Sequence, residues 1–394
     1  MARTRRRAVA DAALRYVAED ATSGYGDAAD RLVRAVRAGG VPVEYRGWSD
    51  TTHGAPPAFV PFSRDDEPER RAVPGAPTVA HLVPEYYRLV RSVMPDGPLV
   101  GHTVWETDRA PRDWPPLLNE TDLVVVPTAW NRDVFVDSGV RVPVAVVPHV
   151  ACNPVPGDRG AFLGLPADVV VLYTISRWDE RKAPFHTVRA YLDAFTADDP
   201  VVLVVKTGLW SELAPPADFR TGHRIEWSTA WQVARIVRDH PRPARVVVVS
   251  EELSSAEIAG LHERGDVFVS LTRGEGWGIG AFDACTYGNP VITTGWGGTL
   301  EYLGTDHPGL VDHRLVPVHH HAHRSYSPDQ RWAEPDLDHA VDLMRAVVAD
   351  PAAARARVAG VRDAARERFA PDRVAAGFLD VLGLKVGTGR ADSP

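Results

Sequence analysis

The sequence predicts an α/β protein made of two domains, each an alternation of buried strands and helices. Three observations lead to this prediction. Residues 267–301 alternate strand, glycine loop and helix twice in succession. A similar alternation begins near residue 14 and starts again at residue 169. A bend rich in proline and glycine follows residue 148, and 394 residues are enough for two or three domains.

The stretch 267–301 carries the clearest local signals. Residues 267–271 and 291–294 are short, apolar and rich in β-branched side chains, which is typical of buried strands. Between them, residues 278–287 have a helical pattern that Gly288 and the following Asn-Pro pair would end. Glycine-rich loops follow both strands. They should lie at the carboxyl ends of the strands, where open α/β sheets bind ligands.

The first glycine loop favours a phosphorylated ligand. Gly276, Gly278 and Gly280 would let backbone approach the ligand closely, and the helix that follows offers unpaired N–H groups to an anion. Glu275 precedes this helix, and Asp283 lies eight positions later inside it. Two carboxylates at different depths of one cleft could hold hydroxyl groups at two places along a nucleotide.

The same loop fits a rival interpretation. Residues 276–281 match the dinucleotide fingerprint G-x-G-x-x-G/A, and Glu301 lies twenty residues further on. An NAD-dependent oxidoreductase would use these glycines. In such enzymes the acidic residue should end the second strand, whereas here a second glycine loop intervenes before Glu301.

The acidic pair in its glycine context resembles the signature of the retaining glycosyltransferases of family 4. That family carries Glu, seven residues and Glu within a Glu-Gly-aromatic-Gly context, and here Glu275 and Asp283 form the pair, the second shortened to Asp. The resemblance implies that Glu275 lies beside the transferred sugar and that Asp283 holds the nucleotide ribose. It also implies that Gly276, Trp277, Gly278 and Ile279 contact the nucleotide-sugar.

The resemblance further implies the GT-B fold, with two Rossmann-like α/β domains facing each other across a cleft and a C-terminal helix crossing back to the N-terminal domain. The expected domains are 1–150 on the acceptor side and 151–365 on the donor side. Residues 366–394 are expected to form the returning helix and a disordered tail. Amphipathic helices are predicted over 335–348 and 352–382.

Lysine is scarce in this chain, with Lys182, Lys206 and Lys385 as its three lysines. Arg177 and Lys182 follow the predicted strand 169–176, and the family carries an Arg and a Lys in this loop that clamp the donor diphosphate. Lys206 ends the next predicted strand and is a second candidate for the same edge. Further along, Ser254 and Glu257 resemble a capping box that starts a helix.

In the N-terminal half, residues 14–18 predict a strand, residues 23–26 a glycine turn and residues 27–38 a helix. The resemblance places this turn, with Gly24 and Gly26, against the cleft. Residues 49–78 lack periodicity and are expected to form a surface excursion. His102 follows a strand that ends at residue 100, and its His-Thr context is similar to that of the family histidine that touches the transferred sugar.

Composition excludes several other classes. A net charge of −8 argues against a general nucleic-acid binder, and no apolar run approaches the length of a membrane span. The arginine-rich start suggests at most peripheral contact with a membrane. Cys152 and Cys285 lack metal-ligand spacing, which favours a reducing cytoplasm. The histidine run 319–323 is expected to be a solvated loop, so neither a metal nor a cofactor is predicted.

The resulting prediction is a hexosyltransferase that moves a sugar from a UDP- or GDP-sugar to a small-molecule or glycan acceptor with retention, independently of metal. Secondary-metabolite and cell-surface glycan biosynthesis are both compatible with it. Three alternatives stay open: an inverting GT-B enzyme using His102 or Glu106 as base, an NAD-dependent oxidoreductase, and a nucleotide-sugar-binding protein without turnover. The sequence makes no prediction of oligomeric state.

Overall fold

The computed structural model describes residues 10–19, 23–49, 58–60, 70–152, 162–213, 225–319 and 325–384. The chain divides into two compact units, with a break between Val150 and Ala151. The first unit comprises Met1–Trp105, Arg112–Val150 and Arg368–Pro394, and the second comprises Glu106–Pro111 and Ala151–Glu367. The short segment Glu106–Pro111 therefore packs with the second unit, although it lies within the expected domain 1–150.

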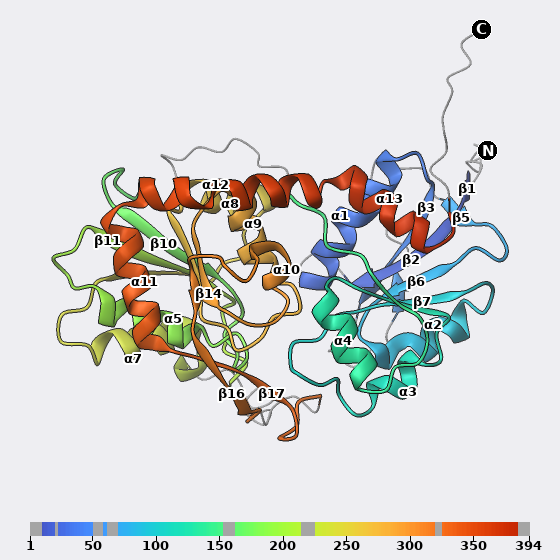
Figure 1. The fold of residues 1–394 in the computed structure, drawn as a ribbon, viewed down its shortest axis with the longest axis horizontal. Helices are drawn as coiled ribbons and strands as arrows, with labels where there is room; N and C mark the ends of the chain where they lie inside the picture. Colours follow the sequence, from blue (N-terminus) through green and yellow to red (C-terminus); the bar gives the residue numbers. More distant parts are fainter. Residues whose placement is uncertain are drawn as a thin grey trace, which may run out of the picture. The chain divides into compact units, whose positions relative to one another are not determined.

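The first unit is organised around a seven-stranded sheet, drawn mainly in blue and cyan in Figure 1. All neighbouring strands are parallel except the edge pair β3 and β4. In spatial order the strands are β4 (Ala58–Val60), β3 (Val43–Ser49), β2 (Leu14–Glu19), β6 (Thr78–His81), β7 (Leu99–His102), β8 (Leu123–Val126) and β9 (Val144–Val146). A separate parallel pair joins β1 (Ala10–Ala12) and β5 (Arg70–Ala72).

The helices of the first unit include one from the far end of the chain. They are α1 (Gly24–Ala38), α2 (Tyr87–Val93), α3 (Trp114–Leu118), α4 (Ala129–Asp137) and α13 (Pro371–Val381), with the 3-10 turn η1 (Pro84–Tyr86). The last helix, α13, packs against α1 inside the first unit. Ser23 caps α1 by accepting a hydrogen bond from the Gly26 N–H. Gly24 and Gly26 thus lie in the first turn of this helix, and the predicted turn before residue 27 is wrong.

The sequence analysis did not predict strand β6. It begins at Thr78, where the predicted surface excursion ends, and it pairs with β2 on one side and β7 on the other. All four of its residues are buried. Its position in the middle of the sheet brings His81, the last residue of β6, directly beside His102 of β7.

The second unit contains a six-stranded sheet in which every pair is parallel. Its strands, in spatial order, are β12 (Arg245–Val249), β11 (Val201–Lys206), β10 (Val170–Ile175), β13 (Val267–Ser270), β14 (Val291–Thr294) and β15 (Leu310–Val311). Its helices are α5 (Pro184–Ala194), α7 (Thr229–Arg238), α8 (Ser255–Arg264), α9 (Ile279–Tyr287), α10 (Leu300–Leu303), α11 (Leu337–Ala349) and α12 (Pro351–Arg368), with the turns η2 (Phe162–Gly164) and η3 (Ile225–Trp227).

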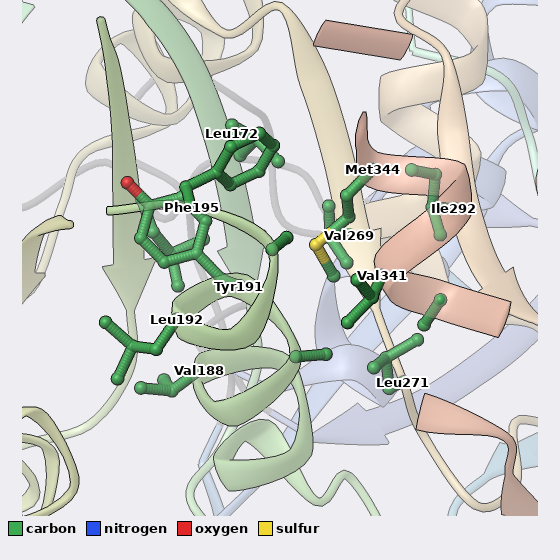
Figure 2. Close-up of a cluster of buried hydrophobic side chains, with 14 of the residues drawn as sticks. Leu172, Val188, Tyr191, Leu192, Phe195, Val269, Leu271, Ile292, Val341 and Met344 are labelled. Carbon is green, nitrogen blue, oxygen red and sulfur yellow. The ribbon is translucent and has the colours of Figure 1, made fainter. Parts of the chain in front are cut away.

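Figure 2 shows the hydrophobic core of this second unit. Helix α5 packs against the strands through its apolar face, from which Val188, Tyr191 and Leu192 project. Met344 of α11 meets the same cluster, because α5 and α11 lie side by side. The α/β fold class predicted from the alternating pattern is confirmed. The core packs against the strands whose carboxyl ends carry the candidate site.

A smaller feature was also missed in the sequence, the antiparallel hairpin of β16 (His313–Pro317) and β17 (Arg331–Pro335). The described residues contain no helix long and apolar enough to cross a membrane. Three predicted features lie outside the described residues: the arginine-rich start, the histidines at 320, 321 and 323, and the C-terminal tail.

Candidate functional site

Parallel pairing brings four loops of the second unit to one edge of its sheet. The loop holding Arg177 and Lys182 follows β10, and Lys206 is the last residue of β11. The two glycine loops follow β13 and β14. Since β11, β10, β13 and β14 are consecutive neighbours in the sheet, their carboxyl ends form one continuous edge.

The two glycine loops fit together backbone against backbone. The Gly298 N–H donates a hydrogen bond of 2.7 Å to the Glu275 carbonyl. A Cβ atom at Gly298 would clash with the Gly276 carbonyl, and Gly297 has a φ of +83°. These close approaches require glycine. The second glycine loop thereby fixes the backbone of Glu275 and Gly276.

Helix α9 begins at this edge with its amino end open. Gly278 is its N-cap residue, with a φ of +83°, and no side chain of the described residues caps the helix there. Gly278, Ile279 and Gly280 are partly exposed, whereas residues 281–286 are buried. An uncapped amino end that solvent can reach can accept an anion from a ligand.

The centre of the site is a group of opposite charges in which Glu275 and Arg181 are buried and Lys182 is partly exposed. The Lys182 ammonium lies 2.6 and 2.7 Å from the two carboxylate oxygens of Glu275. Arg181 donates to one of these oxygens at 3.3 Å and to the Gly274 carbonyl at 2.7 Å. Its own carbonyl accepts from the Arg273 N–H at 2.8 Å. These contacts join the loop after β10 to the loop after β13.

Ionisation at this pair follows from burial and charge acting in opposite directions. Burial alone would raise the pKa of Glu275, but Lys182 and Arg181 outweigh it and keep the pKa below its usual value. Burial lowers the pKa of Lys182, and the Glu275 carboxylate offsets part of that effect. Glu275 is therefore ionised near neutral pH and partly neutralises the cations around it.

Arg177 lies in the same loop as Lys182, and Lys206 ends the neighbouring strand β11, but both side chains have other partners. The Arg177 side chain is 62% exposed, and its guanidinium lies 3.4 Å from Asp179 and 3.2 Å from Glu212. The Lys206 ammonium donates to the Thr207 carbonyl at 3.1 Å, and burial lowers its pKa. The structure therefore pairs Lys182 with Glu275, whereas the exposed Arg177 side chain pairs with Asp179 and Glu212.

Two residues predicted to bind the nucleotide-sugar have buried side chains. Asp283 lies in α9 and is 5% exposed. The Trp277 indole is 2% exposed and packs against the rings of Phe282 and Tyr302. The Trp277 side chain thus belongs to the core, and only the backbone of this residue is suited to contact a ligand.

The sequence prediction did not include Arg181 among the site residues, and it named Glu106 only as a possible base of an inverting route. The Glu106 carboxylate lies 3.4 Å from Arg181 and accepts a hydrogen bond of 3.3 Å from the Tyr326 hydroxyl. Its carbonyl is so close to Gly274 that a Cβ atom there would clash with it. Because this contact joins segments 168 positions apart, spacing along the chain carried no signal for it.

In the first unit, His102 is 1% exposed at the end of β7 and stacks on His81 of β6. The ring centroids are 3.8 Å apart and the planes differ by 6°. The Tyr25 hydroxyl is 2.9 Å from the Thr103 hydroxyl, so the start of α1, with Gly24 and Gly26, lies next to His102 in the fold. The sequence prediction missed His81, because β6 itself was not predicted.

The dinucleotide interpretation lacks its acidic partner. Glu301 lies in the first turn of α10 and not at the end of β14.

The described residues contain no group of three or more His, Cys, Asp or Glu side chains placed to hold a metal ion.

Residues 226–378 match the model described as family 4 glycosyltransferase in conflict systems. The matched segment contains the glycine loop with Glu275 and helix α9 with Asp283. No curated protein sequence matches the chain.

Solved structures with the same fold are GT-B glycosyltransferases. Sucrose-phosphate synthase from Thermosynechococcus elongatus superposes with a TM-score of 0.66 at 16% identity, over 94% of this chain and 98% of that one. Anabaena HepE, solved with UDP, gives 0.59 at 13% identity, over 94% and 99%. A mutant of S. aureus TarM, solved in complex with fondaparinux, alpha-GlcNAc-glycerol and UDP, gives 0.54 at 11% identity over 78% of this chain. The present chain spans about half of TarM, 55% of its length.

Proposed function

We propose that this chain, a glycosyltransferase of the GT-B fold similar to family 4, transfers a sugar from a nucleoside diphosphate sugar to a hydroxyl acceptor with retention of configuration. The observation that carries the proposal is the Lys182–Glu275 pair beside the open amino end of α9. Both groups lie at the carboxyl edge of a parallel sheet. In this proposal residues 151–365 form the donor domain and residues 1–150 the acceptor domain.

The chemistry of this edge suits a diphosphate leaving group. As the glycosidic bond loosens, negative charge grows on the phosphate oxygens. The Lys182 ammonium and the N–H groups at the start of α9 stabilise that charge most strongly when it is largest. Arg177, whose side chain is exposed, swings from Glu212 to the diphosphate and adds a second cation.

Glu275 has two roles in this proposal. In the free protein it keeps the Lys182 ammonium charged and in place. When the donor binds, the diphosphate competes for Lys182, and one carboxylate oxygen of Glu275 becomes available to a sugar hydroxyl while Arg181 retains the other. Asp283, deeper in α9, is assigned to the nucleotide ribose.

A UDP-sugar is the first donor to test. HepE and TarM, which share the fold, were solved with UDP. The acceptor is assigned only to the class of hydroxyl compounds, either a small molecule or a glycan. His102 in the first unit is assigned to a hydroxyl of the sugar or the acceptor.

The proposed retention rests on a front-face route. In this route the acceptor attacks on the face that the phosphate leaves, so no covalent nucleophile is required, and the departing phosphate takes the acceptor proton, so no separate base is required. Glu106, one of the two residues proposed as the base of an inverting route, is engaged with Arg181 and Tyr326. Anomeric analysis of the product by NMR distinguishes the two routes, because an inverted product would contradict the proposal.

The experiment that tests the function is a donor screen on the full chain. A saturating ligand raises the free energy of unfolding by RT ln(1 + [L]/Kd), about 2.7 kcal/mol at 100 times Kd. We expect a UDP- or GDP-sugar to raise Tm and NAD to leave it unchanged. Donor hydrolysis or transfer, followed as release of nucleoside diphosphate, then separates an enzyme from a binding protein. Stabilisation by NAD alone, or donor binding without any turnover, would overturn the proposal.

A further inference from the structure

The histidine pair in the first unit is joined by a buried tyrosine. The Tyr16 hydroxyl lies 2.9 Å from Nδ1 of His81 and 3.2 Å from Nδ1 of His102. Tyr16, His81 and His102 are at most 2% exposed. Phe378 of α13 stacks on His102 and meets Tyr16 edge to face. One hydroxyl group therefore forms hydrogen bonds with two stacked imidazoles, and all three side chains are almost fully buried.

The protonation states of the three groups follow from burial. Burial raises the pKa of Tyr16 well above its usual value, so its hydroxyl keeps its proton. Burial, with a further contribution from the neighbouring histidines, lowers the pKa of both His81 and His102 well below 6.5. Both imidazoles are thus neutral near pH 7, and each carries one N–H and one bare nitrogen.

The hydroxyl can donate only one hydrogen bond, because it has one proton. It must accept at its oxygen from whichever histidine does not receive that proton. If both histidines donated, the Tyr16 proton would be buried without an acceptor among the described residues, which is costly. Tyr16 therefore forces the two histidines into opposite tautomers, one protonated at Nδ1 and the other at Nε2.

Two observations assign the tautomers. The shorter contact, 2.9 Å to His81, suits the O–H donor, and the longer one, 3.2 Å, suits an N–H from His102. In addition, Nε2 of His102 is buried with no hydrogen-bond partner among the described residues. A bare nitrogen tolerates that surrounding better than an orphaned N–H would. Both observations place the His102 proton on Nδ1.

We propose that Tyr16 and His81 are positioning residues that hold His102 as the Nδ1–H tautomer. This leaves the buried Nε2 as a bare acceptor without a donor among the described residues, so a substrate hydroxyl that reaches this nitrogen would donate a hydrogen bond to it. This inference rests on the proposed function, in which His102 contacts sugar or acceptor. It adds a chemical selection. A nitrogen that only accepts binds an O–H group and disfavours a phosphate oxygen, which also only accepts.

Nitrogen-15 NMR of the ligand-free full chain, with selectively labelled histidine, tests the assignment directly. Protonated and bare ring nitrogens differ strongly in chemical shift, so each tautomer has its own spectrum. We expect His102 to show a protonated Nδ1 and a bare Nε2, and His81 to show the reverse. A wild-type spectrum with His102 protonated at Nε2 would overturn the proposal.

Variants test the coupling. Tyr16→Phe removes the shared hydroxyl, and the Nδ1–H pattern of His102 should be lost. In His81→Asn the amide oxygen can still accept the Tyr16 proton, so His102 should keep its pattern, whereas His81→Leu should lose it. Tyr45→Phe is the matched control, since Tyr45 stacks on Tyr16 but its hydroxyl donates to the Glu19 carbonyl. An unchanged His102 spectrum in Tyr16→Phe would refute the coupling.

Kinetics provide a second readout once a donor is known. Tyr16→Phe should lower kcat/KM by roughly 2- to 13-fold, the range that corresponds to one neutral hydrogen bond. His81→Asn should stay near wild type, and His81→Leu should fall with Tyr16→Phe. If the chain transferred no sugar, the proposed function would fail, while the NMR result would still decide the tautomers. Equal losses in His81→Asn and His81→Leu would indicate a merely structural role.

Discussion

Replacing Lys182 by alanine is the perturbation that separates transfer from mere binding. Its ammonium contacts both oxygens of Glu275, at 2.6 and 2.7 Å, so it stands preorganised where the donor diphosphate is proposed to bind. Removal of one preorganised charge-stabilising donor typically costs about 2.7–4 kcal/mol in the transition state. We therefore expect kcat to fall by roughly 10²–10³-fold.

The same change also affects the fold, and the structure indicates by how much. Removing one partner of a buried ion pair destabilises a protein by about 3–5 kcal/mol. Arg181 still lies 3.3 Å from the Glu275 carboxylate, so the loss should be at the low end, about 3 kcal/mol. Adding Glu275→Gln removes the carboxylate charge that Lys182→Ala leaves without its lysine partner. The double variant should therefore be more stable than Lys182→Ala alone. Urea unfolding of the four proteins in this cycle measures the coupling.

The assay is steady-state transfer with the donor varied at saturating acceptor, well below the Tm of the variant. Arg177→Ala is the companion variant. Its side chain is 62% exposed and should change stability by no more than about 0.5 kcal/mol, yet the same argument expects a lower kcat. Interactions that strengthen in the transition state appear in kcat as well as in KM. A Lys182→Ala enzyme with raised KM and unchanged kcat would show that this group only anchors the nucleotide.

Three further predictions follow from single positions. Asp283→Asn should weaken donor binding by roughly 10- to 150-fold, which corresponds to the loss of one hydrogen bond to a charged group. Calorimetry measures this affinity. Unaltered affinity in a folded variant would show that Asp283 is only a helix residue. Gly298→Ala should lower the free energy of unfolding, because its Cβ would clash with a backbone carbonyl. The control is Gly360→Ala, since Gly360 is exposed inside α12 with open space around a Cβ. This variant should raise the free energy of unfolding by about 0.5–1 kcal/mol, and denaturant unfolding measures both. Burial lowers the pKa of His307 from 6.5 to about 4, so the unfolded chain binds more protons between these values and stability falls as pH drops below 6.5, by up to about 1.4 kcal/mol per pH unit. His307→Asn keeps an acceptor for the Gly309 N–H and should flatten this slope. An unchanged slope would show that the pKa of His307 is the same in the folded and unfolded states.

Local chemistry made much of the second unit predictable. The capping box of Ser254 and Glu257 is present as predicted, with both reciprocal bonds. The strand, glycine loop and helix of residues 267–287 also agree with the structure within one or two residues. Such signals lie within a few positions of one another, so they need no knowledge of the rest of the chain.

The candidate site was predictable only in part. The family resemblance and the position after a predicted strand pointed to both Arg177 and Lys182. They did not indicate which of these cations contacts Glu275, nor that Arg181 does so as well. Trp277, expected at the ligand, is buried, because its ring fills a space next to Phe282 that sequence proximity does not reveal.

What the sequence by itself determined is the class of fold and the type of residue at the loops, because β-branched runs, glycines and helix caps act through their neighbours in the chain. What only the tertiary structure decided is which of these segments meet. Strand β6 has four residues and a weak local pattern, yet it lies in the middle of a sheet because β2 and β7 pair with it from both sides. That pairing alone brings His81 onto His102 and both onto Tyr16, since parallel strands align residues that are distant in the sequence.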